Sequence, residues 1–455
     1  MSVAATAPAG DDTVRQLQQQ LAAQGVHTLI AQFTDLHGAA KGKLVPLAHV
    51  GTLMGTGAGF SGPSIAGTGL PRMGPRSEYY GRGDPAAVRA LPWMPGHARV
   101  VCDGYVDNAP FDACPRQVLR RQIARLGERG WSLQTGIEPE FFLLRRGAQG
   151  YEPADPHDRL DKPSYDLKSL PRQQAFLAEL ADGLRGCGLD VFQTDHEDAH
   201  GQYEINFMHD QALASADALM LFKQAAHALA ERHGSVFSMM PKPFANQPGS
   251  GMHFHVSLWQ GERSLFDGAA GDATAPLPTL LRHFIGGVLA HSAALCAVAA
   301  PTVNSYKRLV VGESLSGTSW APAVVAHGPN NRTALVRTLP GRFEWRLPDA
   351  SANPYLASAA LIAAGLDGID RALDPGPACT DDLFERTPAE LAARGIGVLP
   401  QNLGEAITAL EADGVVRDAL GTALSAEFIR LKRTEWAAYA RHVSAWELER
   451  YAAAF

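Results

Sequence analysis

Three strand-like segments of the chain each place two chemically active side chains two residues apart. The pairs are Glu138 and Glu140 in GIEPEFFLL, His253 and His255 in GSGMHFHVSL, and Glu344 and Arg346 in GRFEWRLPD. Residues i and i+2 of a strand point to the same face of a sheet. If the three strands share one sheet, carboxylates, imidazoles and guanidinium groups converge on one cavity. That combination is typical of a metal and phosphate site.

The first two pairs also have purely structural interpretations. The carboxylate pair could lie on an exposed edge strand, which Pro139 favours, but the Phe-Phe-Leu-Leu run that follows indicates burial. Buried carboxylates need a partner, and Mg²⁺ and Mn²⁺ prefer carboxylate oxygens. The histidine pair could be core residues or zinc ligands. Neither a cysteine nor an HExxH motif accompanies it, which disfavours a zinc protease.

Further acidic and basic residues extend this pattern. Glu197 and Glu204 lie in the segment DHEDAHGQYEINF, which could equally be a solvated loop. Arginines are concentrated at Arg308, Arg332, Arg337, Arg342 and Arg346. Carboxylates for a metal and arginines for phosphate predict phosphoryl transfer. The chain has no Walker motif and no kinase-type glycine loop, so a different kind of nucleotide site is expected.

Composition limits the class of protein. With 455 residues, 46% hydrophobic and 19% charged, the chain can form two domains with a large core. A net charge of -7 without a basic run argues against nucleic acid as a partner. Five dispersed cysteines, Cys102, Cys114, Cys187, Cys296 and Cys379, favour a reduced cytoplasmic chain. No signal peptide or membrane span is expected.

The order of elements indicates an α+β fold, because several strands follow one another without a helix between them. Strands are expected near 27–34, 44–45, 98–106, 131–144, 189–195, 202–208, 236–241, 252–259, 333–339 and 342–347. Helices are expected near 13–24, 115–129, 171–186, 213–233, 277–298, 353–371, 403–412 and 424–446. The Gly-rich stretch 51–83 shows neither periodicity, so we expect a long functional loop there.

Several motifs together resemble the glutamine synthetase superfamily. They are FTDLHG, GIEPEFFL, HEDAHGQYE, GSGMHFHVS, PTVNSYKRL and NNR…RFEWRLPDASANPYL, in family order over nearly the whole chain. Within the superfamily the chain is most similar to the γ-glutamylmethylamide synthetase branch, through AQFTDLHG, GAGF, LPWMPG, RLVVG, SLSGTSWAPA, GIGVLPQNLGEA and RHVSAWE.

The resemblance implies a domain organisation and an assembly. After a flexible tail at 1–12, a β-grasp domain would span 13–110. A catalytic domain at 111–455 would form an open funnel of antiparallel strands surrounded by helices. Subunits would form a dodecamer of two stacked hexameric rings with active sites shared between neighbours. Neither nucleic acid nor a membrane is an expected partner.

The resemblance also implies roles for individual residues. Metal ligands would be Glu138, Glu140, Glu197, Glu204, His253 and Glu344, holding two or three Mg²⁺ or Mn²⁺ ions. The substrate glutamate would contact Gly249, Arg308, Arg346 and His253, and the nucleotide His255, Ser257, Arg332, Arg337 and Arg342. Catalysis would involve Asp35 from the neighbouring subunit, Arg337, Glu197 and the flap residue Glu313.

The implied reaction joins the γ-carboxylate of glutamate to an amine, with ATP as co-substrate and a γ-glutamyl phosphate intermediate. Two departures favour methylamine or another small alkylamine over ammonium. Pro248 stands where the family usually has asparagine, and Glu313 directly follows VVG instead of VPGY. The alternatives are a glutamine synthetase that uses ammonium, a polyamine ligase, for which no acidic groove is evident, and a non-catalytic relative that only forms rings.

Overall fold

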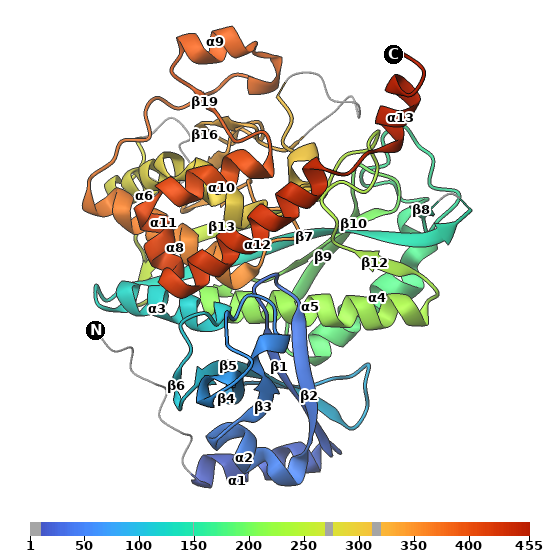
Figure 1. The fold of residues 1–455 in the computed structure, drawn as a ribbon, viewed down its shortest axis with the longest axis vertical. Coiled ribbons are helices and arrows are strands. Elements are labelled where there is room, and N and C mark those ends of the chain that lie inside the picture. Colours follow the sequence, from blue (N-terminus) through green and yellow to red (C-terminus); the bar gives the residue numbers. More distant parts are fainter. Residues whose placement is uncertain (1–10, 149, 269–275, 312–319) are drawn as a thin grey trace.

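The structure is a computed structural model, and it describes residues 11–148, 150–268, 276–311 and 320–455. Two sheets organise the chain, a small one near the N-terminus and a large one that carries most of the polar motifs (Figure 1). The predicted α+β class is confirmed. A domain boundary near residue 110 stays a prediction, supported by the position of the two sheets on either side of it.

The small sheet has the order β2-β1-β5-β4-β3 and a parallel central pair, β1 and β5. Its elements are α1 (Asp11–Ala23), β1 (Thr28–Thr34), β2 (Ala40–Pro46), α2 (Val50–Gly55), β3 (Ala58–Ser61), β4 (Glu78–Ala90), β5 (His97–Val106) and β6 (Ala109–Pro110). The long loop expected over 51–83 is wrong in part, because α2, β3 and the start of β4 occupy both ends of it, while residues 65–74 form neither helix nor strand. The glycines concealed the helix α2 and the strand β3 because they dilute the hydrophobic pattern, and β3 pairs with the start of β4.

The large sheet is built around one long strand, β7, and runs in the order β16-β17-β18-β13-β7-β10-β9. Its strands are β7 (Ser132–Gly147), β8 (Gly150–Pro153), β9 (Val191–His196), β10 (Gln202–Phe207), β11 (Asp210–Gln211), β12 (Val236–Ser238), β13 (Met252–Gln260), β14 (Arg263–Ser264), β16 (His327–Pro329), β17 (Val336–Leu339) and β18 (Arg342–Trp345). All pairs are antiparallel except β16 with β17. A separate ribbon pairs β15 (Val324–Val325) with β19 (Gly397–Val398).

Most helices that follow the small sheet cover the outside of the large sheet (Figure 1). The helices that follow the small sheet are α3 (Pro115–Gly127), α4 (Gln174–Gly186), α5 (Ala212–Arg232), α6 (Thr279–Ala290), α7 (Ser292–Ala299), α8 (Pro354–Asp370), α9 (Pro388–Ala393), α10 (Leu403–Ala412), α11 (Gly414–Leu420), α12 (Thr422–Ala440) and α13 (Ala445–Tyr451). In Figure 1, α4 and α5 lie between the large sheet and the small sheet, while α13 projects from the body. The inner face of the sheet is therefore left for the polar residues.

Two predicted helices are divided in the structure. The helix expected over 277–298 breaks at His291, whose ring nitrogens lie 2.6 Å from Asp413 Oδ2 and 2.9 Å from Asp367 Oδ2. These contacts tie the break to α11 and α8. The helix expected to reach residue 446 ends at Ala440, and Ser444 caps the separate helix α13 with a capping box.

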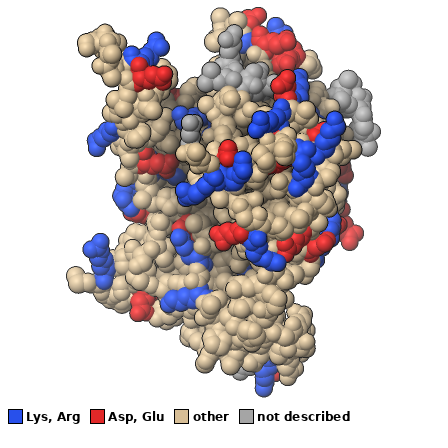
Figure 2. All heavy atoms as spheres, turned by 90° about the vertical axis from the view of Figure 1, so that its right-hand side faces the viewer, with Lys and Arg blue, Asp and Glu red and all other residues tan. Residues whose placement is uncertain are grey.

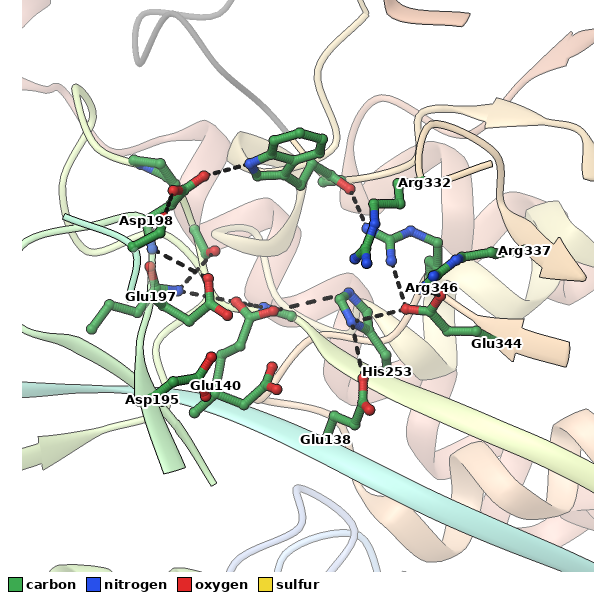
Figure 3. A pocket seen from close by; sticks show the side chains of 18 of the residues that line it. Glu138, Glu140, Asp195, Glu197, Asp198, His253, Arg332, Arg337, Glu344 and Arg346 are labelled. Atoms are coloured by element: carbon green, nitrogen blue, oxygen red, sulfur yellow. Dashed lines mark hydrogen bonds and ion pairs between the residues drawn. The ribbon is translucent and has the colours of Figure 1, made fainter. Parts of the chain in front are cut away.

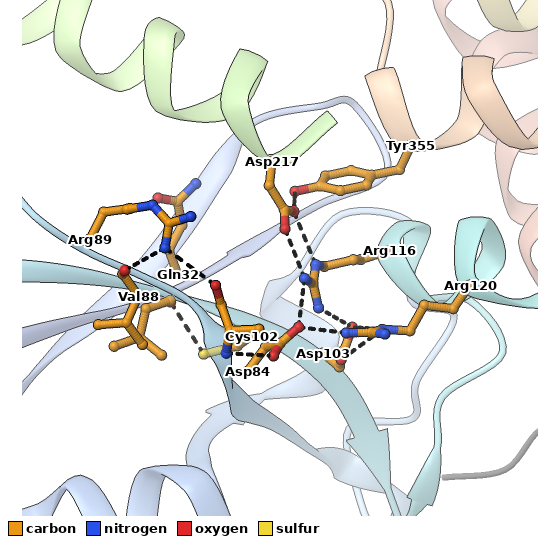
Figure 4. A network of polar contacts seen from close by, with 12 residues as sticks. Gln32, Asp84, Val88, Arg89, Cys102, Asp103, Arg116, Arg120, Asp217 and Tyr355 are labelled. Carbon is orange, nitrogen blue, oxygen red and sulfur yellow. Dashed lines mark hydrogen bonds and ion pairs between the residues drawn. The ribbon is translucent and has the colours of Figure 1, made fainter. Parts of the chain in front are cut away.

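A buried charge cluster joins the small sheet to the helices of the large one (Figure 4). Arg116 of α3 lies 2.8 Å from Asp84, 2.9 Å from Asp103 and 2.8 Å from Asp217. Arg120, one turn later, contacts Asp84 and Asp103 at 2.6 and 3.0 Å. Because these carboxylates come from β4, β5 and α5, the two arginines link four elements of the chain.

Charges of both signs are interspersed over the face in Figure 2, and the lower lobe, which carries the small sheet, presents mainly uncharged side chains. Among the described residues, no single helix has the length and apolar character needed to cross a membrane. The pair α6 and α7 meets that test only when joined, and the two helices bend by 74°.

Candidate active site

A row of polar residues crosses the large sheet, because neighbouring strands bring the i, i+2 pairs into register. The paired positions are Arg337 with Glu344, Glu344 with His255, His253 with Glu138, Glu140 with Glu204, and Glu204 with Asp195. The three pairs predicted from strand alternation thus share one face of one sheet. They line a cavity of about 590 Å³, with carboxylates on one side and arginines on the other (Figure 3).

The acidic side of the cavity holds four carboxylates, those of Glu140, Asp195, Glu197 and Glu204. Burial raises the pKa of Glu140 to about 7 and that of Asp195 to about 6. Burial, followed by repulsion from neighbouring carboxylates, holds the pKa values of Glu197 and Glu204 well above the usual range. Such a group of acids is unfavourable without a cation between them.

Glu140 is held by Gly251, the last residue of the GSG segment. Gly251 N donates to Glu140 Oε2 at 2.8 Å, and Glu140 N donates to Gly251 O at 3.2 Å. A Cβ on Gly251 would lie 2.7 Å from His253 Nε2 and 3.0 Å from both Glu140 Oε1 and Arg308 Nη2. The glycine therefore leaves open a small space bounded by an imidazole, a carboxylate and a guanidinium group.

The middle of the row contains the two histidines. His253 Nδ1 lies 3.3 Å from Glu344 Oε1 and 3.9 Å from Glu138 Oε2, and its Nε2 lies 4.0 Å from Glu140 Oε1. Burial, with Arg346 nearby, holds the pKa of His253 well below its usual value, so the ring is neutral. A neutral imidazole with one free nitrogen can bind a metal ion.

The second histidine is oriented by its partners. Arg342 Nε donates to His255 Nδ1 at 3.1 Å, so the ring proton resides on Nε2, which lies 3.0 Å from Glu138 Oε1. Glu138, His255 and Glu344 also place one potential ligand atom each within 4.8 Å of one another. The prediction assigned His253 to the metal and His255 to the nucleotide; both rings lie beside Glu138, but both nitrogens of His255 are already engaged, by Arg342 and by Glu138.

The basic side of the cavity centres on Glu344. Burial opposes ionisation of this residue, but the adjacent His253 ring and the guanidinium groups of Arg346 and Arg337 lower the pKa of Glu344 to about 2. Arg337 Nη1 donates to Glu344 Oε2 at 3.0 Å and Arg346 Nη1 to Glu344 Oε1 at 2.5 Å. Arg346 Nε is buried and has no hydrogen-bond partner among the described residues. Arg346 therefore has donor capacity left for an anion.

The other predicted contacts lie around the same space. Arg308, Arg332, Arg342 and Gly249 line the large cavity, and Pro248 lies beside Gly249. Ser257 instead lines an adjoining cavity of about 350 Å³, together with Phe192, Met208, Trp259 and His255. Glu138, His255 and Arg342 border both spaces, so a polar cavity and a partly aromatic cavity lie side by side.

One predicted catalytic residue, Asp35, does not line this cavity. Asp35 is buried in the turn after β1, where the main-chain N–H groups of His37 and Ala39 donate to its Oδ1 at 3.0 and 2.9 Å. Within one chain it does not line the cavity, so its predicted role depends on a neighbouring subunit. Glu313 lies outside the described residues.

Several lining residues escaped the prediction, among them Asp195, Gln202, Tyr165 and Trp320. Trp320 donates from its indole to Asp198 Oδ2 and accepts from Arg346 Nη2 at 3.0 Å, which connects the acidic and basic sides. Asp195 with Glu197, and Gln202 with Glu204, are themselves i, i+2 pairs. The same spacing rule would have found Asp195 and Gln202, whereas Trp320 carries no comparable signal.

The residues present fit a divalent cation. Hard cations take carboxylate oxygens, and the cavity offers four uncompensated carboxylates beside a neutral imidazole. Their pKa values are raised chiefly by burial, with mutual repulsion at Glu197 and Glu204, which a bound cation would relieve. The donor set is therefore suited to Mg²⁺ or Mn²⁺.

Comparisons with known proteins agree with this chemistry. The family model described as "Glutamine synthetase, catalytic domain" matches residues 112–451. The glutamate–methylamine ligase of Methyloversatilis universalis is 48% identical over 96% of this chain and 98% of that protein. The glutamine synthetase of Rhizobium meliloti is 39% identical over 93% of this chain and 96% of that protein.

Solved structures extend the similarity to three dimensions. "GmaS/ADP complex-Conformation 1" superposes with a TM-score of 0.89 at 37% identity, covering 96% of this chain and 99% of that one. "Apo GmaS without ligand" gives a TM-score of 0.87 at the same identity. With a family match over most of its length and a catalytic-domain sheet of the same kind, the chain belongs to the glutamine synthetase family.

Proposed function

We propose that the protein is an ATP-dependent ligase that joins methylamine, or another small alkylamine, to the γ-carboxylate of L-glutamate. The observation that carries the proposal is the division of one cavity into an uncompensated carboxylate side and an arginine side (Figure 3). The 48% identity to a glutamate–methylamine ligase supports the choice of amine. The products would be γ-glutamylmethylamide, ADP and phosphate.

The first half of the reaction forms a bond between a γ-carboxylate oxygen of glutamate and the terminal phosphorus of ATP, while the bond to ADP breaks. Bound Mg²⁺ or Mn²⁺ would neutralise phosphate charge and polarise the transferring group. Glu138, Glu140, Glu197, Glu204, His253 and Glu344 would hold these ions. Arg337 and Arg346 are oriented by Glu344, so they can stabilise developing negative charge with little rearrangement.

Substrate glutamate would lie beside Gly249, with its carboxylates directed at Arg308 and Arg346. Arg308 is already held by Leu347 O and Arg346 O, at 3.0 and 3.2 Å, so its guanidinium is fixed in direction. Positioning of this kind converts two mobile reactants into a defined geometry. The nucleotide would occupy the adjoining cavity, near Ser257 and His255.

In the second half, the amine nitrogen attacks the γ-carbon and phosphate leaves. The amine arrives as an alkylammonium ion and must transfer a proton to a nearby carboxylate before it attacks. Glu197 borders the cavity and can accept it. Asp35 of a neighbouring subunit would assist, which requires the proposed dodecamer of two hexameric rings with shared active sites.

A phosphate-release assay with glutamate, Mg-ATP and methylamine, ethylamine or ammonium tests the proposal. Methylamine is expected to give the highest kcat/KM. A preference for ammonium would make the protein a glutamine synthetase, as in the Rhizobium relative. Absence of phosphate release with every amine would refute the ligase assignment itself.

The inactive control for this assay is Glu140→Gln, which keeps an acceptor for Gly251 N but removes the negative charge. Its activity is expected to be lost at saturating Mg²⁺. The matched variant Glu152→Gln alters a half-exposed surface ion pair with Arg145 and is expected to retain full activity.

A further inference from the structure

One buried side chain bridges the acidic side of the cavity and the loop beside it. Gln202 opens β10 and is only 1% exposed. Its Nε2 donates to Glu140 Oε2 at 3.0 Å, to Gly249 O at 3.1 Å and to Ser250 Oγ at 3.2 Å. Its Oε1 accepts from Ala199 N at 3.0 Å. Every polar atom of this amide is therefore used.

These contacts fix the orientation of the amide. A main-chain N–H can only donate, so the oxygen must face Ala199. The NH₂ group must then face Glu140 and Gly249, where a carboxylate and a carbonyl can only accept. Since an amide nitrogen carries two hydrogens, Gln202 can serve both acceptors at once.

The loop that Gln202 holds is also attached to Glu140 by the main chain. Gly251 N donates to the same carboxylate oxygen at 2.8 Å. Ser250 N donates to Pro241 O at 2.7 Å, which closes the other side of the loop. A displacement of segment 249–251 by about 1 Å would break hydrogen bonds to Glu140, because such bonds weaken steeply outside their normal range.

We infer that Gln202 is a positioning residue that couples cation binding at Glu140 to glutamate binding at segment 249–251; the inference rests on the proposed function. A cation that orients Glu140 fixes the amide of Gln202, and the amide fixes the carbonyl of Gly249. The reverse holds for glutamate, because coupling between two binding equilibria is reciprocal. Gln202 itself touches neither reacting atom.

The experiment measures Mn²⁺ binding by calorimetry, with and without saturating glutamate, in the wild type, Gln202→Met and Gln202→Asn. Methionine keeps the length and volume but removes both donors. Asparagine keeps the amide but is shorter by one methylene, so it cannot reach both acceptors. The matched control is Gln122→Met, since Gln122 is also buried and donates to a main-chain carbonyl, Ala419 O, away from the cavity.

In the wild type, glutamate is expected to tighten Mn²⁺ binding at least about fivefold. Gln202→Met is expected to weaken Mn²⁺ binding about 10–100-fold and to bring the glutamate effect below about twofold. Gln202→Asn should lie between these values, and it carries the test if the methionine variant does not fold. Gln122→Met should keep both the Mn²⁺ affinity and the glutamate effect.

Two results would overturn the inference. One is a wild type in which Mn²⁺ binding does not depend on glutamate although the enzyme releases phosphate normally. The other is a pair of Gln202 variants that lose thermal stability but keep wild-type Mn²⁺ affinity and coupling. If the wild type binds Mn²⁺ but shows no glutamate-dependent phosphate release, the proposed function fails and the inference fails with it. Phosphate release by the wild type therefore distinguishes failure of the function from failure of the inference alone.

Discussion

Replacing Arg116 by methionine should destabilise the protein more than any other single change in the charge cluster of Figure 4. Its side chain is 3% exposed and contacts Asp84, Asp103 and Asp217. Without it, Asp84 and Asp103 keep only Arg120 as a cationic partner, and Asp217 keeps the hydroxyl of Tyr355. Removing one partner from a buried ion pair costs about 3–5 kcal/mol, because the remaining charges stay desolvated. We expect a loss in that range at pH 7.

The matched variant is Arg120→Met. Its side chain is 21% exposed and contacts two of the same carboxylates, so the expected loss is smaller, about 1–2 kcal/mol. Both variants would be compared with the wild type by urea unfolding at one protomer concentration. Amide hydrogen exchange would report where protection is lost, which is expected along β4, β5 and α3.

The pH dependence of stability separates the contribution of charge from that of packing. Burial alone would raise the pKa of Asp84, but Arg116 and Arg120 lower it overall. The contribution of the Asp84 carboxylate to wild-type stability is therefore present above about pH 4 and is lost as the pH falls further. In Arg116→Met the unpaired carboxylates can take up protons, so the deficit should shrink between pH 7 and pH 5. A deficit below about 1 kcal/mol, or an equal deficit at both pH values, would refute the electrostatic account.

Three further changes have distinct expected results. Gly251→Ala should lower kcat/KM about 100-fold with little loss of thermal stability, because the added Cβ would lie 2.7 Å from His253 Nε2; near-wild-type kinetics would contradict this. His291→Gln should cost about 1–2 kcal/mol in urea unfolding at pH 6. Burial alone would lower the pKa of His291, but Asp413 and Asp367 raise it overall, so the contribution of the charged ring to stability is present below about pH 6.5 and should fade as the pH rises. A loss of stability that stays the same at every pH would disprove this account. Asp35→Ala should reduce amine-dependent turnover far more than ATP affinity; an equal loss of both would rule out its role.

The parts of the site that could be predicted from sequence depend on short-range geometry. Strand alternation is a local property, so Glu138 and Glu140 were correctly placed on one face before any partner strand was known. The register between strands is not local. It places Asp195 opposite Glu204, two strands away from Glu138, and sequence spacing contains no information about that distance.

The same difference between local and long-range information applies to the prediction of the fold. The long helix α8 and the strand β7 were expected over 353–371 and 131–144, and the structure contains both. The segment 51–83 was misread because the four-residue strand β3 is stabilised by pairing with β4, and the six-residue helix α2 is too short to show a helical period. His291 divided a predicted helix because two aspartates from distant helices hold its ring.

The two charge clusters of this protein differ in a way that indicates their purposes. Around Arg116, carboxylates and guanidinium groups meet at 2.6–3.0 Å and satisfy one another inside the chain. Around Glu140, carboxylates outnumber the cations nearby, and burial raises the pKa of Glu140 to about 7 although Arg308 and Arg346 act to lower it. A chain gains no stability from such an arrangement, since apolar residues would pack there at lower cost. The carboxylates of this cavity are therefore better suited to binding a cationic ligand than to stabilising the fold.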